Sequence, residues 1–272
     1  MPRVRRECGP NSARPEAGTK TVATALRLLT LFTHTSPEWT VKELSCQLHL
    51  PYSTAYRYVS ALESSGFLTR DGANGVYRIG LPVIELGGVA LHQLDVRLHG
   101  MSYLEHLADA TGYNANLAVL YQADALHVGF AIRSQVTQYY GVLGRRSPAN
   151  CTALGKAMLA DLPFDQVRRL IEKYGWRPQT PHSIRSFEEL ERDLAKTRER
   201  GYAIDNFERS MESKCIAAAI RNRLGRAAGA ISVTIPKNRL SEIDMANLAR
   251  IVVDHAHMIS HHLGYNYLLS AQ

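Results

Sequence analysis

Hydrophobic residues recur at helical spacing in two short stretches between residues 40 and 64. In the first stretch the apolar residues fall on one helical face: Val41, Leu44 and Leu48. Thr40 precedes them and Glu43 follows three residues later, which is the capping-box pattern of a helix start. Pro51 then favours a break, because it forces the preceding residue out of helical geometry. The pattern predicts two helices joined by a tight turn.

The second predicted helix covers about residues 52–64 and has one apolar and one polar face. Ala55, Val59 and Leu62 form the apolar face. The other side carries hydroxyl groups and a single arginine, with no acidic residue, which suits contacts with base edges and phosphates in a DNA major groove. The predicted DNA-contacting residues of this helix are Tyr52, Ser53, Thr54, Tyr56, Arg57 and Ser60.

Two β-rich runs follow, at residues 67–70 and 76–79, around a turn that contains two glycines. This arrangement predicts a hairpin, a wing that carries Arg70 and Arg78 as further DNA contacts. Helix, turn, helix and basic wing together predict a winged helix-turn-helix. A helical pair with a hairpin that binds another protein, or that only packs, is the alternative.

The remaining pattern divides the chain further. Residues 1–19 lack periodicity and are expected to form a disordered arm, whereas residues 20–34 form an amphipathic helix that completes a DNA-binding domain over 20–80. Residues 81–98 are expected to be a linker helix that continues, with a break at Gly100, to Gly112. From about residue 114, three strands (one at 139–143), three helices, three more strands and a last helix (241–263) predict an α+β domain over 99–268 with an antiparallel sheet.

Composition and charge narrow the class of protein. The 272 residues are 45% hydrophobic and 21% charged, which is typical of a globular chain. The net charge is +7, of which residues 1–80 carry +4, where phosphate contacts would need it. The sequence has no run of 18 apolar residues, so no membrane span is predicted. The basic N-terminus is not followed by an apolar segment, so no signal peptide is predicted either. Four cysteines without metal or disulfide spacing are expected to be reduced thiols in the cytoplasm.

Several separated motifs resemble the IclR family of bacterial transcriptional regulators. The resemblance covers about residues 20–265 and includes the stretch from Leu50 to Arg57 and the strand from Val76 to Gly80. It also includes the motifs Cys151–Ala160, Arg198–Asp205, Cys215–Ala218 and Ala230–Thr234. The resemblance implies a winged helix-turn-helix, a linker helix and a GAF-like effector domain that acts as a dimer or tetramer. The effector-binding residues that it implies are Ala153, Leu154, Asp205, Cys215, Ser232 and Thr234.

Two residues depart from the family's pattern. Glu212 stands where the family usually has a glycine, and Phe207 replaces the first of two acids, which leaves Glu208. The resemblance therefore leaves open whether Glu212 alters or abolishes effector binding.

The residues themselves also indicate a site for a small acid. Ala153 and Leu154 begin a predicted helix, whose free amide groups favour a carboxylate. Ser232 and Thr234 alternate along a strand and so share one face, where hydroxyl groups bind oxygen functions. Asp205 would repel a second carboxylate, which favours mono-acids over di-acids. Cys151 and Cys215 are also small enough to be ordinary core residues.

Two other functions would need residue patterns of their own. A cysteine-dependent enzyme would need a nucleophile motif around Cys151 or Cys215, and the sequence contains none. A metal-responsive regulator could use the histidines of the last helix, of which His257 and His261 share a face. The helix carries histidines at 255, 257, 261 and 262, but the two on one face are only half a zinc site, so no metal and no cofactor is expected.

The sequence therefore predicts a cytoplasmic, non-enzymatic, DNA-binding regulator. Its C-terminal domain is expected to bind a small carboxylic acid, and a homodimer or homotetramer is expected to bind a pseudo-palindromic operator. Repression and activation, the target genes and the effector's identity stay open at this level.

Overall fold

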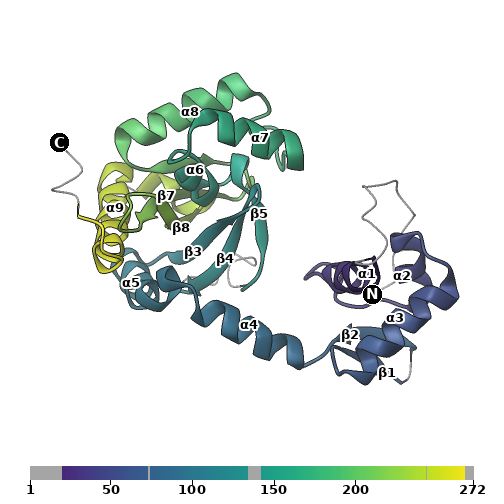
Figure 1. Cartoon of the computed structure of the whole chain (residues 1–272). Helices are drawn as coiled ribbons and strands as arrows, with labels where there is room; N and C mark the ends of the chain where they lie inside the picture. The colour runs from purple at the N-terminus through teal and green to yellow at the C-terminus, as the bar shows by residue number, and fades with distance from the viewer. Residues whose placement is uncertain (1–19, 73, 134–141, 243, 267–272) are drawn as a thin grey trace. The chain divides into compact units, whose positions relative to one another are not determined.

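The computed structural model describes residues 20–72, 74–133, 142–242 and 244–266 (Figure 1). The chain divides into two compact units, with the division between Ala90 and Leu91. The expected disordered arm (1–19) and most of the strand expected at 139–143 lie outside the described residues.

The N-terminal unit contains the helix pair and the hairpin that the sequence predicts. Its elements are α1 (Lys20–Thr30), α2 (Val41–Leu48), α3 (Tyr52–Ser64), β1 (Leu68–Asp71) and β2 (Val76–Ile79). The capping box is confirmed, since Glu43 N–H donates to Thr40 Oγ1 at 3.3 Å and Thr40 N–H donates to Glu43 Oε2 at 2.8 Å. Leu28, Leu44 and Val59 are completely buried, so three helices share one small core.

The segment expected to be one linker helix contains two helices, α4 (Pro82–His92) and α5 (Asp95–Thr111). The break was expected at Gly100 but lies before Asp95, where Leu94 adopts an extended conformation. Gly100 lies within α5 because the helix packs closely there: a Cβ atom would lie 3.2 Å from Leu117 Cδ2. Gly100 thus permits a close approach to the sheet and does not interrupt the helix.

The C-terminal unit is built on one antiparallel sheet of six strands, in the order β5-β4-β3-β8-β7-β6. The strands are β3 (Asn114–Tyr121), β4 (Asp124–Ala131), β5 (Arg146–Pro148), β6 (Ala203–Asn206), β7 (Ser213–Arg221) and β8 (Ala227–Pro236). The first and second halves of the domain meet where β3 pairs with β8. This pairing brings residues near position 116 beside residues near position 232.

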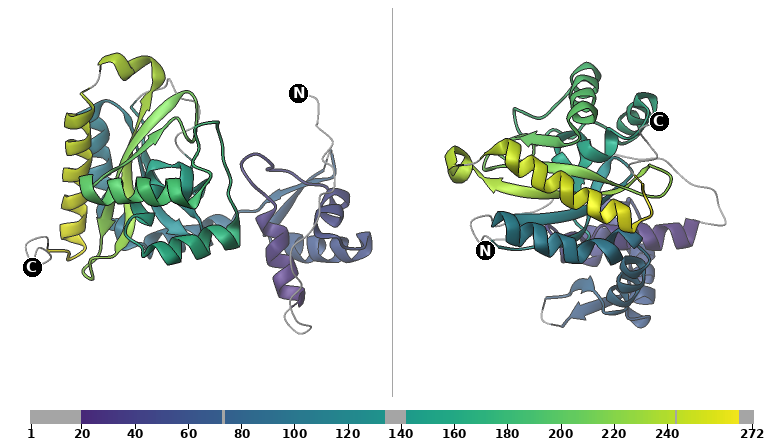
Figure 2. Two further views of the ribbon diagram at one scale, coloured as in Figure 1. Left: turned by 90° about the horizontal axis from the view of Figure 1, so that it is seen from above. Right: turned by 90° about the vertical axis from the view of Figure 1, so that its left-hand side faces the viewer.

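Helices cover both faces of this sheet, as the two views of Figure 2 show. One face packs against α5 and α9 (Met245–His262) in the main hydrophobic core. The other face packs against α6 (Ala153–Leu159). The other helices on that side of the sheet are η1 (Ala149–Cys151), α7 (Phe164–Tyr174) and α8 (Phe187–Arg200). A short 3₁₀ helix, η2 (Lys237–Glu242), precedes α9. Within the described residues, no helix combines the length and apolar composition needed to span a bilayer.

Candidate functional site

The polar face of α3 lies on the surface of the N-terminal unit. Tyr52 and Tyr56 are 57% and 49% exposed, and their rings stack with centroids 6.5 Å apart. Ser53 and Arg57 are also exposed, whereas Ala55 and Val59 point into the core. Thr54 and Ser60 are partly exposed. The helix thus presents all six predicted residues outside the small core.

The two wing arginines differ in their surroundings. Both Arg70 and Arg78 are exposed. Arg78 is already engaged, because its guanidinium lies 2.5 Å from Glu38 Oε1 and 3.7 Å from Asp71 Oδ2. A phosphate at Arg78 would have to compete with these carboxylates. The competition is weak, because exposed ion pairs of this kind contribute only about 0–1 kcal/mol.

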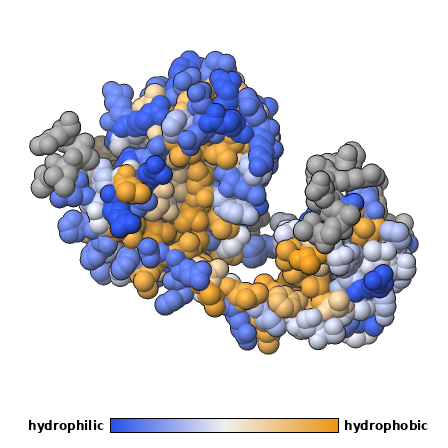
Figure 3. Space-filling view, viewed as in Figure 1, coloured by the Kyte–Doolittle hydropathy of each residue, from blue (hydrophilic) through white to orange (hydrophobic). Residues whose placement is uncertain are grey.

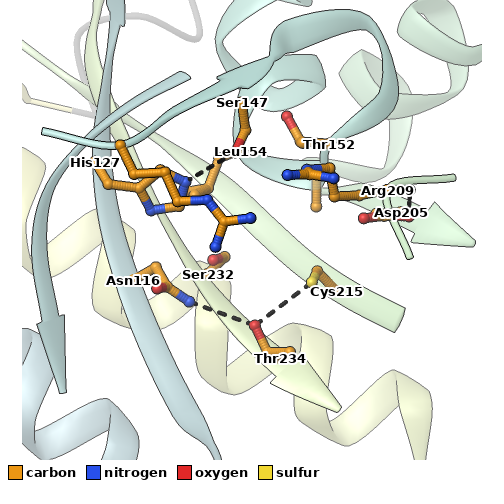
Figure 4. Close-up of a pocket in the computed structure, with 12 residues that line it drawn as sticks. Asn116, His127, Ser147, Thr152, Leu154, Asp205, Arg209, Cys215, Ser232 and Thr234 are labelled. Atoms are coloured by element: carbon orange, nitrogen blue, oxygen red, sulfur yellow. Dashed lines mark hydrogen bonds between the residues drawn. The ribbon is translucent and has the colours of Figure 1, made fainter. Parts of the chain in front are cut away.

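All six residues implied as effector contacts line one cavity in the C-terminal unit (Figure 4). The cavity, including its opening, holds about 430 Å³ of space between atoms. It lies between the sheet and the start of α6. Its lining residues are Asn116, His127, Arg145, Ser147, Thr152, Ala153, Leu154, Asp205, Arg209, Cys215, Ser232 and Thr234.

The floor of the cavity follows from strand register. Thr234, Cys215 and Asp205 lie opposite one another across β8, β7 and β6, so one row of side chains crosses three strands. Asn116 Nδ2 donates to Thr234 Oγ1 at 3.3 Å, and Cys215 Sγ lies 3.5 Å from the same oxygen. Ser232 lies two residues from Thr234 and lines the same cavity, whereas Val233 between them belongs to the opposite core.

The cavity's upper edge is the start of α6. Thr152 caps this helix, because its Oγ1 accepts the N–H of Gly155 at 3.2 Å. Only glycine fits at 155, since a Cβ atom would lie 2.2 Å from the Cα atom of Ala149. The turn therefore fixes Ala153 and Leu154 at the cavity. However, α6 has only seven residues, so its dipole is a weaker attraction for an anion than the sequence suggested.

Two arginines in the cavity wall were missed by the sequence interpretation. Arg145 precedes β5, and Arg209 lies in the loop that follows β6, the strand that contains Asp205. Arg209 Nη1 donates to Gln179 Oε1 at 3.1 Å, but its buried Nε has no hydrogen-bond partner in the described part of the chain. His127, opposite, is neutral at physiological pH, because burial and the two arginines lower its pKa to about 4. Positive charge at this cavity therefore comes from arginine.

Asp205 is the acidic group of the cavity and is only 2% exposed. Its Oδ1 accepts two backbone N–H groups, from Glu208 at 2.7 Å and from Arg209 at 3.2 Å. Burial, reinforced by the nearby charge of Glu208, raises the pKa of Asp205 to about 7. The carboxyl group is thus partly protonated near neutral pH.

A buried ion cluster lies directly behind Asp205. The Lys156 ammonium, on α6, is 2.5 Å from Glu208 Oε1 and 2.9 Å from Asp193 Oδ2 on α8. Burial opposes the charge on Lys156, but the two carboxylates outweigh it and raise the pKa of this lysine. Thr180 Oγ1 donates to the carbonyl oxygen of Phe207 at 2.7 Å, so the loop beside the cavity is held from behind.

The departures from the family's pattern lie beside the cavity and not in its wall. Glu212 is exposed, outside the lining residues, and its carbonyl accepts the N–H of Lys237 at 2.9 Å. Phe207 adopts the left-handed conformation, with φ of 62°. Neither side chain occupies the space in which a ligand would lie.

The cysteines do not have the properties of nucleophiles. Cys151 and Cys215 are free, and burial raises the pKa of both thiols, that of Cys151 to about 12. A thiol with a raised pKa carries almost no thiolate at neutral pH.

The C-terminal histidines are not assembled as a metal site. His255 Nδ1 lies 2.8 Å from the carbonyl oxygen of Ile251, and His262 Nε2 lies 2.7 Å from the hydroxyl of Tyr103. Among the described residues, no three His, Cys, Asp or Glu side chains are grouped so that they could hold a metal ion.

Comparisons with known proteins agree with both units. A family model described as the IclR helix-turn-helix domain matches residues 21–72, and one described as bacterial transcriptional regulator IclR C-terminal matches residues 88–261. The HTH-type transcriptional repressor AllR of Escherichia coli is 29% identical over 266 residues, which cover 97% of this chain and 98% of the repressor.

Solved structures show the same architecture. An IclR transcriptional regulator from Alicyclobacillus acidocaldarius has a TM-score of 0.78 and 26% identity, and the match covers 90% of this chain and 98% of that one. An IclR homologue from Microbacterium hydrocarbonoxydans, solved with 4-hydroxybenzoate, has a TM-score of 0.75 and 24% identity over 89% of this chain and 98% of its own. The chain therefore belongs to the IclR family of DNA-binding transcriptional regulators, which are not enzymes, and its C-terminal domain is the effector-binding domain of that family.

Proposed function

We propose that the C-terminal cavity binds a small organic acid, and that this binding changes the affinity of the protein for its operator. The observation that carries the proposal is the pair Arg145 and Arg209 in the wall of a cavity that also contains neutral polar side chains. Arginine is the side chain best suited to bind a carboxylate, through two parallel hydrogen bonds. The buried Nε of Arg209 offers a donor for that purpose.

The remaining cavity residues are suited to the rest of such a ligand. Ser232, Thr234 and Asn116 offer hydroxyl and amide groups for a keto or hydroxyl oxygen, and Leu154 supplies apolar contact. The Microbacterium homologue was solved with 4-hydroxybenzoate, an acid that combines these two functions. Two arginines also weaken the expectation that Asp205 excludes di-acids, because their positive charges attract a second carboxylate.

The DNA partner is proposed to contact the exposed face of α3. Arg57 and the hydroxyl side chains would reach base edges and phosphates, and Arg70 would contact the backbone beside the wing. A single reading helix covers too few base pairs for specificity, so a dimer on a pseudo-palindromic site is proposed. A DNA partner supports the proposal that the protein acts in the cytoplasm.

The surface proposed for the dimer is α4. The helix has no buried residue, and Ile84, Leu86 and Val89 are 68%, 58% and 58% exposed. Figure 3 shows hydrophobic side chains gathered along this helix. Contiguous apolar surface of this kind typically marks a contact with another protein, here a second copy of the chain. An effector that binds one arrangement of the dimer more tightly shifts the spacing of the two reading helices and so the DNA affinity.

Calorimetric titration of the full chain tests the proposal. Glyoxylate, pyruvate, lactate and 4-hydroxybenzoate are titrated into wild type, Arg209→Ala and Arg223→Ala; the last removes an arginine of the β7–β8 turn outside the cavity lining. At least one acid should bind saturably, and Arg209→Ala should weaken it roughly 10-fold or more, as loss of a charge-assisted contact predicts. If the acid binds wild type and Arg209→Ala with equal affinity, the proposal that it binds in this cavity is wrong.

A further inference from the structure

We propose that Asp205 binds the acid effector as a protonated carboxyl group, which donates a hydrogen bond to the ligand's carboxylate. The inference rests on the proposed function, because it specifies how the same cavity recognises an acid. It assigns a proton-linked role to a residue that would otherwise repel the ligand.

The geometry of Asp205 distinguishes its two oxygens. Oδ1 accepts the N–H groups of Glu208 and Arg209, which leaves it the role of a carbonyl oxygen. Oδ2 has no hydrogen-bond partner among the residues that the structure describes, and the side chain lines the cavity (Figure 4). A carboxyl group whose first oxygen accepts two backbone hydrogen bonds carries its proton on the second. That second oxygen is the one left for the ligand.

The charges around Asp205 explain why the carboxyl group keeps a proton. Lys156 is the cation directly behind it, but its ammonium contacts Glu208 and Asp193. One ammonium therefore faces two carboxylates, and an ionised Asp205 would add a third negative charge to a buried region. The charged and titratable groups that face Asp205 are Lys156 from α6, Glu208 and Arg209 from the loop after β6, Cys215 from β7, Cys151 from η1, and His127 and Arg145 across the cavity.

These neighbours set the sign of the pH dependence. Burial and the charge of Glu208 raise the pKa of Asp205 to about 7 before any ligand is bound. A bound carboxylate adds another negative charge and raises that pKa further. Binding is therefore strongest below pH 7 and takes up a proton above pH 7. His127, with a pKa of about 4, does not titrate in this range.

Calorimetry at pH 6 and pH 8 tests the inference, with the tightest of glyoxylate, pyruvate, lactate and 4-hydroxybenzoate as the probe. From a pKa of about 7, the protonated fraction falls about tenfold between these pH values, so the wild-type affinity should fall about tenfold. Titration at pH 8 in buffers of different ionisation enthalpy should show uptake of close to one proton per ligand. Wild-type affinity that stays constant or rises from pH 6 to pH 8 overturns the inference.

The variant Asp205→Asn tests whether the side chain at position 205 donates or accepts the hydrogen bond to the ligand. The amide places N–H groups where the carboxyl carries its proton, while its oxygen can still accept the two backbone N–H groups. Asp205→Asn should bind the probe within about threefold of wild type at pH 6 and should lose the pH dependence; Asp205→Ala should bind more weakly at both pH values. Glu212→Gln, which changes an exposed carboxyl in the loop after β6, is the matched control and should behave as wild type.

The two levels of the proposal fail differently. If an acid binds wild type but Asp205→Asn abolishes binding at pH 6, Asp205 acts as an ionised acceptor, and this inference is wrong while the proposed function stands. If none of the four acids binds wild type, the proposed function and this inference fall together. Wild-type proton uptake decides the question even if a variant at position 205 does not fold.

Discussion

The buried ammonium of Lys156 offers a sharp test of how the C-terminal domain is held together. Its side chain is 1% exposed, and the ammonium contacts Glu208, whose side chain is 7% exposed, and Asp193, at 26%. Lys156→Met preserves most of the side-chain volume but leaves both carboxylates without their cation. The variant therefore isolates the charge of the cluster from its packing.

The expected cost follows from the burial of the partners. Removal of one member of a buried ion pair typically destabilises a protein by about 3–5 kcal/mol, because the remaining charge lacks compensation. Asp193 keeps some contact with water, which moves the expectation toward the lower limit. For a domain of this size each kcal/mol shifts Tm by about 2–4 °C, so a loss of about 3 kcal/mol in Lys156→Met should lower Tm by roughly 6–12 °C.

Urea and thermal unfolding followed by circular dichroism measure this loss. Lys156→Met/Glu208→Gln should recover a large part of it, because the most buried carboxylate is then neutral. Lys196→Met, an exposed lysine on α8, is the control and should change the free energy of unfolding by about 0.5 kcal/mol or less. A loss below about 1 kcal/mol for Lys156→Met would refute the reasoning, since it would mean that the buried carboxylates do not depend on the ammonium.

Three further outcomes are expected. Arg57→Ala should weaken operator binding by about 1–3 kcal/mol if Arg57 reads a base, and wild-type binding should fall steeply with salt; an unchanged Kd in a mobility-shift titration would exclude Arg57 from the interface. Ile84→Glu/Val89→Glu should convert the proposed dimer into a monomer in light scattering at micromolar concentration, because charge is placed at exposed apolar positions of α4; an unchanged mass would contradict a dimer interface on α4. Cys151 and Cys215 should resist alkylation by iodoacetamide at pH 8 in the native protein, because burial raises the pKa of both thiols, and rapid labelling by mass spectrometry would contradict this.

The six residues implied by the resemblance to the IclR family make up half of the residues that line the cavity. Six residues inferred from separated motifs line one cavity, which the strand register explains for Thr234, Cys215 and Asp205. Motifs carry such information because each positions a short piece of backbone. They did not reveal Arg209, although it lies only four residues after Asp205. Nothing local distinguishes an arginine that faces a cavity from one that faces water.

The sequence by itself determined the DNA-binding unit almost completely. Helical periodicity, the Thr40 capping box and Pro51 are local signals, and they placed α2 and α3 within a residue of their observed limits. Contacts in a helix-turn-helix join residues close in the chain, so hydrophobic spacing and caps suffice to specify it.

Only the tertiary structure decided the charge of the cavity and its protonation. Asn116 reaches Thr234 because β3 pairs with β8, and Lys156 meets Glu208 because α6 packs over β6 and β7. These partners are separated by 118 and 52 residues, so no periodicity links them. The pKa of Asp205 depends on burial and on the distances between such partners, and both exist only once the sheet has closed around them.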